Sequence, residues 1–68
     1  MKDLEVYFKA TLVRYNFGDP FKQHTKTYDH YPSEEELKEF LEECNKDDYH
    51  KDFATTITVD KVFQVVNK

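Results

Sequence analysis

The chain has 68 residues, a formal net charge of −4 and aromatic side chains at 16% of its positions. A chain of about 60 residues buries only about 60% of the surface that it exposes when unfolded, so the composition indicates one domain with a thin core. The negative charge argues against binding nucleic acid with the whole surface. The single cysteine, Cys44, excludes an internal disulfide and fits a reducing compartment. The N-terminal residues resemble neither a signal peptide nor a membrane span, so a cytoplasmic location is expected.

The first predicted element is a β-strand at residues 4–15, where side chains alternate with a period of two. One face of this strand is apolar and is expected to lie in the core: Leu4, Val6, Phe8, Ala10 and Leu12. The other face carries Tyr7, Val13 and Tyr15 among polar residues. The only glycine and a proline predict a turn at residues 16–20.

A second strand is predicted at residues 21–31, which are extended by composition but polar. Its lysines favour a position at the edge of a sheet, where charge discourages pairing with another sheet.

The helix is predicted to follow directly. Ser33 stands at the N-cap, and Glu36 three residues later completes a capping box. Several carboxylates lie in the first turn, where the helix dipole favours them. Asn45 is the expected end of the helix. An apolar stripe at helical spacing is expected to face the sheet: Leu37, Phe40, Leu41 and Cys44.

The last predicted strand covers residues 54–66. Ile57 and Val59 share a face with Phe63 and Val65, but Lys61 interrupts that row. Two interpretations are favoured, namely a β-bulge at residues 60–61 or a bend in the strand at that point. A tight turn there, which would create a fourth strand, is a weaker alternative, because Asp60 and Lys61 lack the glycine that such turns prefer.

The order of elements predicts an α+β fold, β-β-α-β, as a single domain over residues 1–68. The most apolar strand belongs in the centre. A hairpin places the second strand on one side of it, and a right-handed crossover through the helix places the third on the other. The sheet is therefore expected to be antiparallel with strand order 2-1-3, and the helix covers one face.

The face of the sheet without a helix is the first candidate interface. Tyrosine is enriched in the cores of protein interfaces, and dimerisation would bury area that a short chain lacks. The alternative is an ordinary wet face of an antiparallel sheet. The residues expected on this face are Tyr7, Val13, Tyr15 and Tyr28, with Val62 and Val66 beside them.

The acidic helix is the second candidate surface. Residues 33–52 hold nine acidic and three basic side chains, a balance of −6, whereas the remaining residues sum to +2. Glu35, Glu39 and Glu43 are expected to form a straight line on the face opposite Leu37 and Phe40, with Glu42 beside them. Each like-charged pair costs about 0.2–0.5 kcal/mol, partly offset by pairs such as Glu34 with Lys38. The line is either a solvated face that maintains solubility or a surface for a protein partner with a basic groove.

No residues combine into a predicted catalytic or metal site. His24 and His30 would lie about 20 Å apart on a straight strand, and neither they nor His50 have the spacing of zinc ligands. Cys44 paired with His50 is rejected as a nucleophile, because the C-terminal end of a helix raises the pKa of a thiol. The sequence therefore predicts a protein that is not an enzyme and holds no metal or cofactor.

An alternative function is binding of single-stranded nucleic acid, because bases alternate with an aromatic residue along the second strand. The residues concerned are Lys22, His24, Lys26, Tyr28 and His30. The same lysines have a structural reason to lie on an edge strand.

In size, aromatic content and the capped helix "YPSEEELKEFLEE", the chain resembles the small acidic accessory proteins encoded by phages and mobile elements. The resemblance implies a module that binds and inhibits a host protein in the host cytoplasm, in some cases by imitating DNA. It carries no functional residue over to this sequence.

Overall fold

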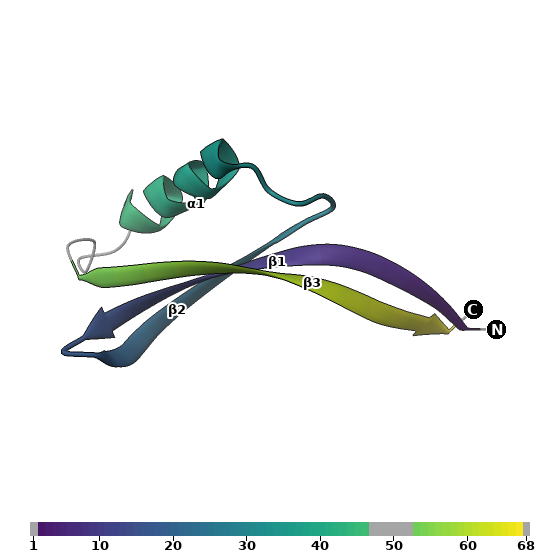
Figure 1. The fold of residues 1–68 in the computed structure, drawn as a ribbon, viewed down its shortest axis with the longest axis horizontal. Coiled ribbons are helices and arrows are strands. Elements are labelled where there is room, and N and C mark those ends of the chain that lie inside the picture. The colour runs from purple at the N-terminus through teal and green to yellow at the C-terminus, as the bar shows by residue number, and fades with distance from the viewer. Residues whose placement is uncertain (1, 47–52, 68) are drawn as a thin grey trace.

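The computed structural model describes residues 2–46 and 53–67 and contains the four predicted elements in the predicted order (Figure 1). The elements are β1 (Lys2–Asn16), β2 (Asp19–Tyr28), α1 (Glu34–Lys46) and β3 (Ala54–Asn67). The sheet is antiparallel with the order β2-β1-β3, and α1 lies across one of its faces. The predicted α+β fold and strand order are therefore confirmed.

The two strand pairs differ in regularity. The β1–β2 ladder runs from Phe8 opposite Tyr28 to Asn16 opposite Asp19, and its register shifts between Arg14 and Tyr15. The β1–β3 ladder runs from Lys2 opposite Asn67 to Tyr15 opposite Ala54 without a shift. The bulge considered at residues 60–61 is therefore wrong, and the irregularity lies in the other ladder. Lys61 therefore lies on the same side of β3 as Val59 and Phe63. Its ammonium group is not under the helix and lies 5.3 Å from the centre of the Phe63 ring.

The β1–β2 turn has two residues, Phe17 and Gly18, with φ angles of 52° and 84°. Two consecutive positive φ angles are typical of a type I′ hairpin turn, which matches the twist of the flanking strands. Glycine adopts this conformation without cost, whereas the side chain of Phe17 disfavours it.

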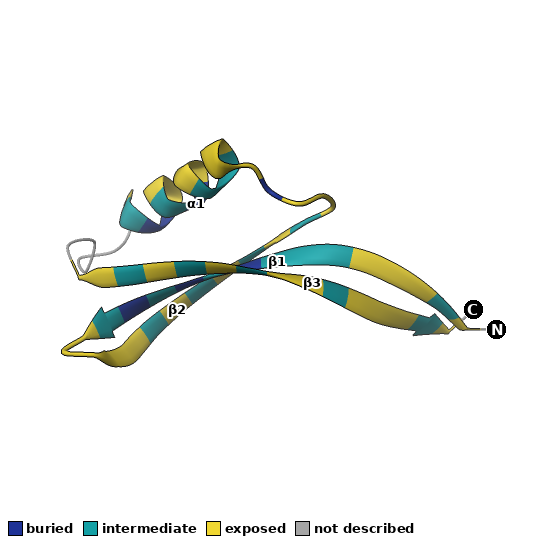
Figure 2. Ribbon diagram, in the orientation of Figure 1, coloured by how far each residue is buried: buried dark blue, intermediate teal, exposed yellow. Residues whose placement is uncertain are grey.

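The core lies between α1 and the adjacent half of the sheet (Figure 2). Ala10 and Leu12 of β1 are buried against Phe40 and Cys44 of α1. A ring of half-buried apolar side chains surrounds these four: Tyr28, Leu37, Leu41, Ile57 and Val59. The predicted apolar stripe of the helix is confirmed.

The sheet extends well beyond the helix as a two-stranded ribbon, here called the arm, made of residues 2–7 and 62–67 (Figure 1). A 13-residue helix is about 20 Å long, whereas a 15-residue strand is about 50 Å long, so α1 covers only part of β1. Leu4 and Val6, predicted in the core, are exposed for this reason. The radius of gyration is 14.5 Å, against about 11 Å for a compact domain of this length.

Candidate protein-binding surfaces

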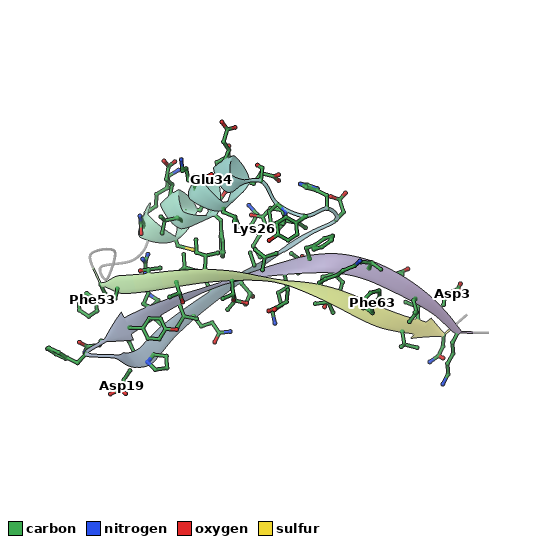
Figure 3. All side chains as sticks on the ribbon, in the orientation of Figure 1. Asp3, Asp19, Lys26, Glu34, Phe53 and Phe63 are labelled. Carbon is green, nitrogen blue, oxygen red and sulfur yellow. The ribbon has the colours of Figure 1, made fainter. Side chains whose placement is uncertain are left out.

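Four apolar side chains of the arm lie together on the face that α1 covers further along the sheet. The register pairs Leu4 with Val65 and Val6 with Phe63, and paired residues of an antiparallel ladder point to the same side. Their exposed fractions are 64%, 57%, 44% and 58% in that order. We call these four residues the apolar arm face. Figure 3 labels one of them, Phe63. A cluster of exposed apolar side chains is one of the features by which interaction sites are recognised, so this face is a candidate.

The backbone at the base of the arm also has an open edge. β2 begins to pair with β1 at Phe8, so residues 2–7 of β1 have a described neighbour only on the β3 side. At this corner lies a shallow pocket of about 410 Å³. Its lining consists of Val6, Tyr7, Thr27, Tyr28, Asp29 and Gln64.

Three of the four residues predicted for the helix-free face do lie there. Tyr7, Val13 and Tyr15 are on the side opposite α1, and each is half-buried. The hydroxyl of Thr56 lies 3.3 Å from the Tyr15 hydroxyl and donates a hydrogen bond to it. Val62 pairs with Tyr7 and Val66 with Asp3, which confirms their predicted side. The use of this face as an interface stays a prediction.

Tyr28 lies on the other side and corrects that prediction. It pairs with Phe8 and packs against the core under α1. Its hydroxyl is buried without a hydrogen-bond partner among the described residues. Burial raises the pKa of Tyr28, and Lys26 partly opposes this. The face of Tyr28 depends on the register of the β1–β2 ladder, which the composition of the second strand does not reveal.

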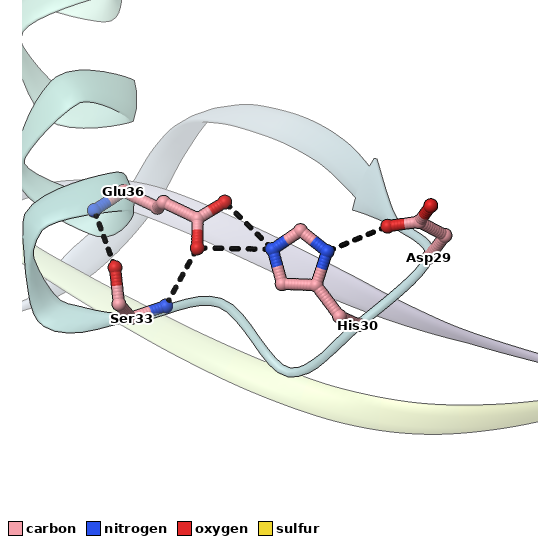
Figure 4. A network of polar contacts seen from close by, with 4 residues as sticks. All are labelled: Asp29, His30, Ser33 and Glu36. Carbon is pink, nitrogen blue, oxygen red and sulfur yellow. Dashed lines mark hydrogen bonds and ion pairs between the residues drawn. The ribbon is translucent and has the colours of Figure 1, made fainter.

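The predicted capping box is confirmed at the start of α1 (Figure 4). The Ser33 amide donates to Glu36 Oε1 at 3.1 Å, and the Glu36 amide donates to Ser33 Oγ at 3.2 Å. The Ser33 amide, followed by His30, lowers the pKa of Glu36.

His30 connects this cap to the end of β2. Its Nε2 lies 2.8 Å from Glu36 Oε2, and its Nδ1 lies 2.5 Å from Asp29 Oδ1. These contacts, with Asp29 the stronger, raise the pKa of His30, and the contact with His30 lowers the pKa of Asp29. The three side chains therefore tie the β2–α1 connection together most firmly when His30 is protonated.

The glutamates of α1 divide into two groups. Glu36 serves the cap, Glu34 pairs with Lys38 at 3.5 Å, and Glu43 pairs with Lys26 of β2 at 3.4 Å. The remaining three are exposed and form no ion pair with a described residue, and we call them the outer acidic face: Glu35, Glu39 and Glu42.

The contact of Glu43 with β2 corrects the predicted straight line of glutamates. Successive steps of four residues advance 400° around a helix, so a row at i, i+4 and i+8 drifts sideways. Glu43 has turned toward Lys26, although Glu35 at the other end of the row still points outward. The outer acidic face therefore contains three of the four predicted glutamates, Glu35, Glu39 and Glu42, and lacks Glu43.

Arg14 is a buried residue that the sequence patterns did not predict. Its guanidinium is fully buried and donates to Thr55 Oγ1 at 2.7 Å and to Asn45 Oδ1 at 2.5 Å. Asn45 lies in the last turn of α1, where the helix dipole favours a positive charge. The sequence contained a signal for the burial of Arg14, because Arg14 follows Ala10 and Leu12 in the same alternating row and is expected on the same face of the strand.

Within residues 2–46 and 53–67, no three histidine, cysteine or acidic side chains gather as metal ligands would. Cys44 is buried, and His50 lies outside the described residues. The described part of the chain also contains no helix long and apolar enough to cross a membrane.

The basic row of β2 faces α1. Lys22, His24, Lys26 and Tyr28 are half-buried, whereas the residues between them are exposed. Lys26 also contacts the Tyr28 ring at 5.6 Å.

Comparison with models of protein families, with curated proteins and with solved structures finds no match to this chain.

Proposed function

We propose that this chain is a protein-binding module that acts by contact and performs no catalysis. The observation that carries the proposal is the apolar arm face, four large apolar side chains that share one side of the sheet and lie beyond the helix. An isolated two-stranded ribbon is only marginally stable in water, so an uncovered arm of this kind favours a bound state.

The expected gain from covering these side chains is moderate. Burying the exposed half of a Leu, Val or Phe side chain contributes about 1 kcal/mol, so the four contribute about 4 kcal/mol. Association costs about 4–15 kcal/mol in lost freedom of motion. A partner must therefore contact more than the apolar arm face, and the open backbone edges beside it are suitable.

The outer acidic face is the proposed second surface. Its three glutamates repel one another at spacings of three and four residues, and none of them forms an ion pair with a described residue. A protein groove lined by lysine and arginine would compensate them, including a groove that normally holds nucleic-acid phosphates. The module would then inhibit its partner by occupying that groove.

The structure does not favour the nucleic-acid alternative. Single-stranded binding needs an open row of bases and aromatic rings. Here Lys26 is paired with Glu43, and Tyr28 packs against the core.

The proposal is tested by affinity capture from the lysate of the cells that naturally express the chain. Four tagged baits are compared: the wild type, an arm variant (Val6→Lys with Phe63→Lys), an acidic-face variant (Glu35→Gln, Glu39→Gln, Glu42→Gln) and a control (Phe17→Lys with Phe21→Lys). The control removes two exposed phenylalanines outside the arm.

We expect the wild type and the control to recover the same protein, either the untagged chain or another protein, and the arm variant to lose it. The acidic-face variant should lose a partner that has a basic groove. Recovery of the same proteins by all four baits would refute the proposed function.

A further inference from the structure

We propose that the arm binds a second copy of this chain, and that the two copies join through their β3 edges in one six-stranded antiparallel sheet. This inference rests on the proposed function, because it names the protein that the arm binds.

The two outer edges of the sheet differ in their protection. The β2 edge carries Pro20, lies beside the register shift at residues 14–15 and includes Lys22 and Lys26. Prolines, bulges and lysines are the devices by which proteins prevent pairing at a sheet edge. β3 offers 14 residues without a proline or a register shift, and no described strand pairs with its outer side. The β3 edge is therefore the one open to another strand.

Charge also favours β3 as a contact between identical chains. The whole chain has a net charge of −4, and two copies repel each other over most of their surface. β3 contains one acidic residue, Asp60, and one basic residue, Lys61, so its net charge is zero. The least repulsive place for two copies to meet is this strand.

A twofold axis perpendicular to the sheet restricts the register. Directly opposite residues of an antiparallel pair point to the same side of the sheet. The axis must therefore lie between one residue and the same residue of the second copy, and not between two neighbouring positions of the strand. An axis at Asp60 or Lys61 would place like charges opposite each other, which is unfavourable. An axis at Val62 avoids this and aligns residues 57–67 of both copies. Lys61 then lies opposite Phe63 of the second copy, the same cation–ring pair that β3 already contains at 5.3 Å.

The register at Val62 also brings part of the apolar arm face close to the helix of the other copy. The flank of α1 that bears Glu36 and Glu43 lies toward β2, where Glu43 meets Lys26. By helical geometry the opposite flank, with the half-buried Leu37 and Leu41, lies toward β3. Val65 of the second copy would lie opposite Val59, on the side of β3 next to this flank. Each helix would therefore shield Val65, the part of the apolar arm face nearest to it, of the other copy.

The exposed area is consistent with a missing partner of this size. The chain exposes 5295 Å², whereas a globular monomer of 8.2 kDa exposes about 4500 Å². The excess of about 800 Å² is close to the area that each partner buries in a standard protein interface, which is also about 800 Å². In the dimer both outer acidic faces would lie on the same side of the sheet.

The test begins with the molar mass of the unmodified chain by sedimentation equilibrium over a concentration series. We expect twice 8.2 kDa for the wild type and for a Phe21→Glu control, and 8.2 kDa for Phe63→Glu. Phe63 is exposed, so this variant should keep its circular dichroism spectrum.

A disulfide trap then tests the register, in a background with Cys44→Ala. Val62→Cys places two thiols across the axis, within the Cα separation of 4.4–6.8 Å that disulfides require. Thr56→Cys is the matched control, because it lies on the same strand and face, but its two copies would be about 40 Å apart. We expect a covalent dimer from Val62→Cys and none from Thr56→Cys.

A wild-type mass of 8.2 kDa at every concentration would overturn this inference, and so would a dimer in which Val62→Cys does not cross-link. If the chain is a monomer but the arm captures a different protein, the inference fails and the proposed function stands. If the chain is a monomer and the arm captures nothing, both fail.

Discussion

At the scale of single residues, Arg14 shows how a thin core joins three elements. Its guanidinium connects β1 to Thr55 of β3 and to Asn45 at the end of α1. Burial of a charge is costly unless hydrogen bonds replace the lost water, and these two contacts contribute to that replacement. Arg14 therefore holds the C-terminal end of the helix to the sheet, whereas the Ser33–Glu36 cap and His30 hold its N-terminal end.

The network around His30 predicts a pH dependence of stability. The pKa of His30 is raised, so its contribution is fully present below the ordinary value of 6.5 and is lost as pH rises through the raised value. The pKa values of Asp29 and Glu36 are lowered, so their contributions are present above 3.8 and 4.5 and are lost as pH falls through the lowered values. The network is therefore strongest between about pH 4.5 and 6.5.

We expect His30→Gln to lower the midpoint of thermal unfolding at pH 5.5 and to change it much less at pH 8.5. Thermal unfolding followed by circular dichroism at the two pH values checks this, with His24→Gln as the control variant. An equal loss at both pH values would contradict the assigned role of His30.

The sequence predicted some of these residue contacts and missed others for a physical reason. The Ser33–Glu36 cap is local, because its two residues are three positions apart in one turn of helix. His30 meets Glu36 only because of the path between β2 and α1, and Arg14 meets Asn45 only after the helix has packed. Contacts that depend on the path of a connection or on packing are not visible in short-range patterns.

At the scale of elements, the β1–β2 hairpin contains a residue that its turn disfavours. Phe17 has a φ of 52° and is fully exposed, so no packing of its ring compensates for this conformation. Asparagine tolerates a positive φ far better and is preferred before glycine in type I′ turns. Phe17→Asn should raise the free energy of unfolding by about 1 kcal/mol, and urea denaturation measures it. Phe17→Val is the control, and it should not stabilise the chain. A lower stability for Phe17→Asn would show that the Phe17 ring makes a contact that the exposed turn does not reveal.

The strands and the helix follow from periodicity, but their registers do not. Alternation identified β1, and the apolar stripe with its cap identified α1. The polar residues of β2 fit either face, so the bulge beside Arg14 and the side of Tyr28 could not be predicted. The absence of a shift in β3 follows from the arm, because Lys61 needs no bulge to reach solvent where the helix no longer covers the sheet.

At the scale of the whole molecule, a short helix on long strands determines which surfaces are available. The side chains predicted for the core row of β1 do lie on the side of the sheet that carries α1. Leu4 and Val6 are nevertheless exposed, because α1 does not extend that far along the strand. An alternating pattern predicts the face of a side chain and not whether anything covers that face. The strongest candidate surface is therefore the apolar arm face, on the same side of the sheet as the helix, instead of the tyrosine face that the sequence indicated.

The measurement that tests this account most directly is site-specific photo-crosslinking in the cells that express the chain. A benzophenone amino acid replaces Phe63 in one variant and Phe17 in the other, because both rings are exposed but only Phe63 lies on the arm. The account predicts a discrete protein adduct from position 63 and none from position 17. No adduct from position 63, or the same adducts from both positions, would contradict the claim that the arm is a protein-binding surface.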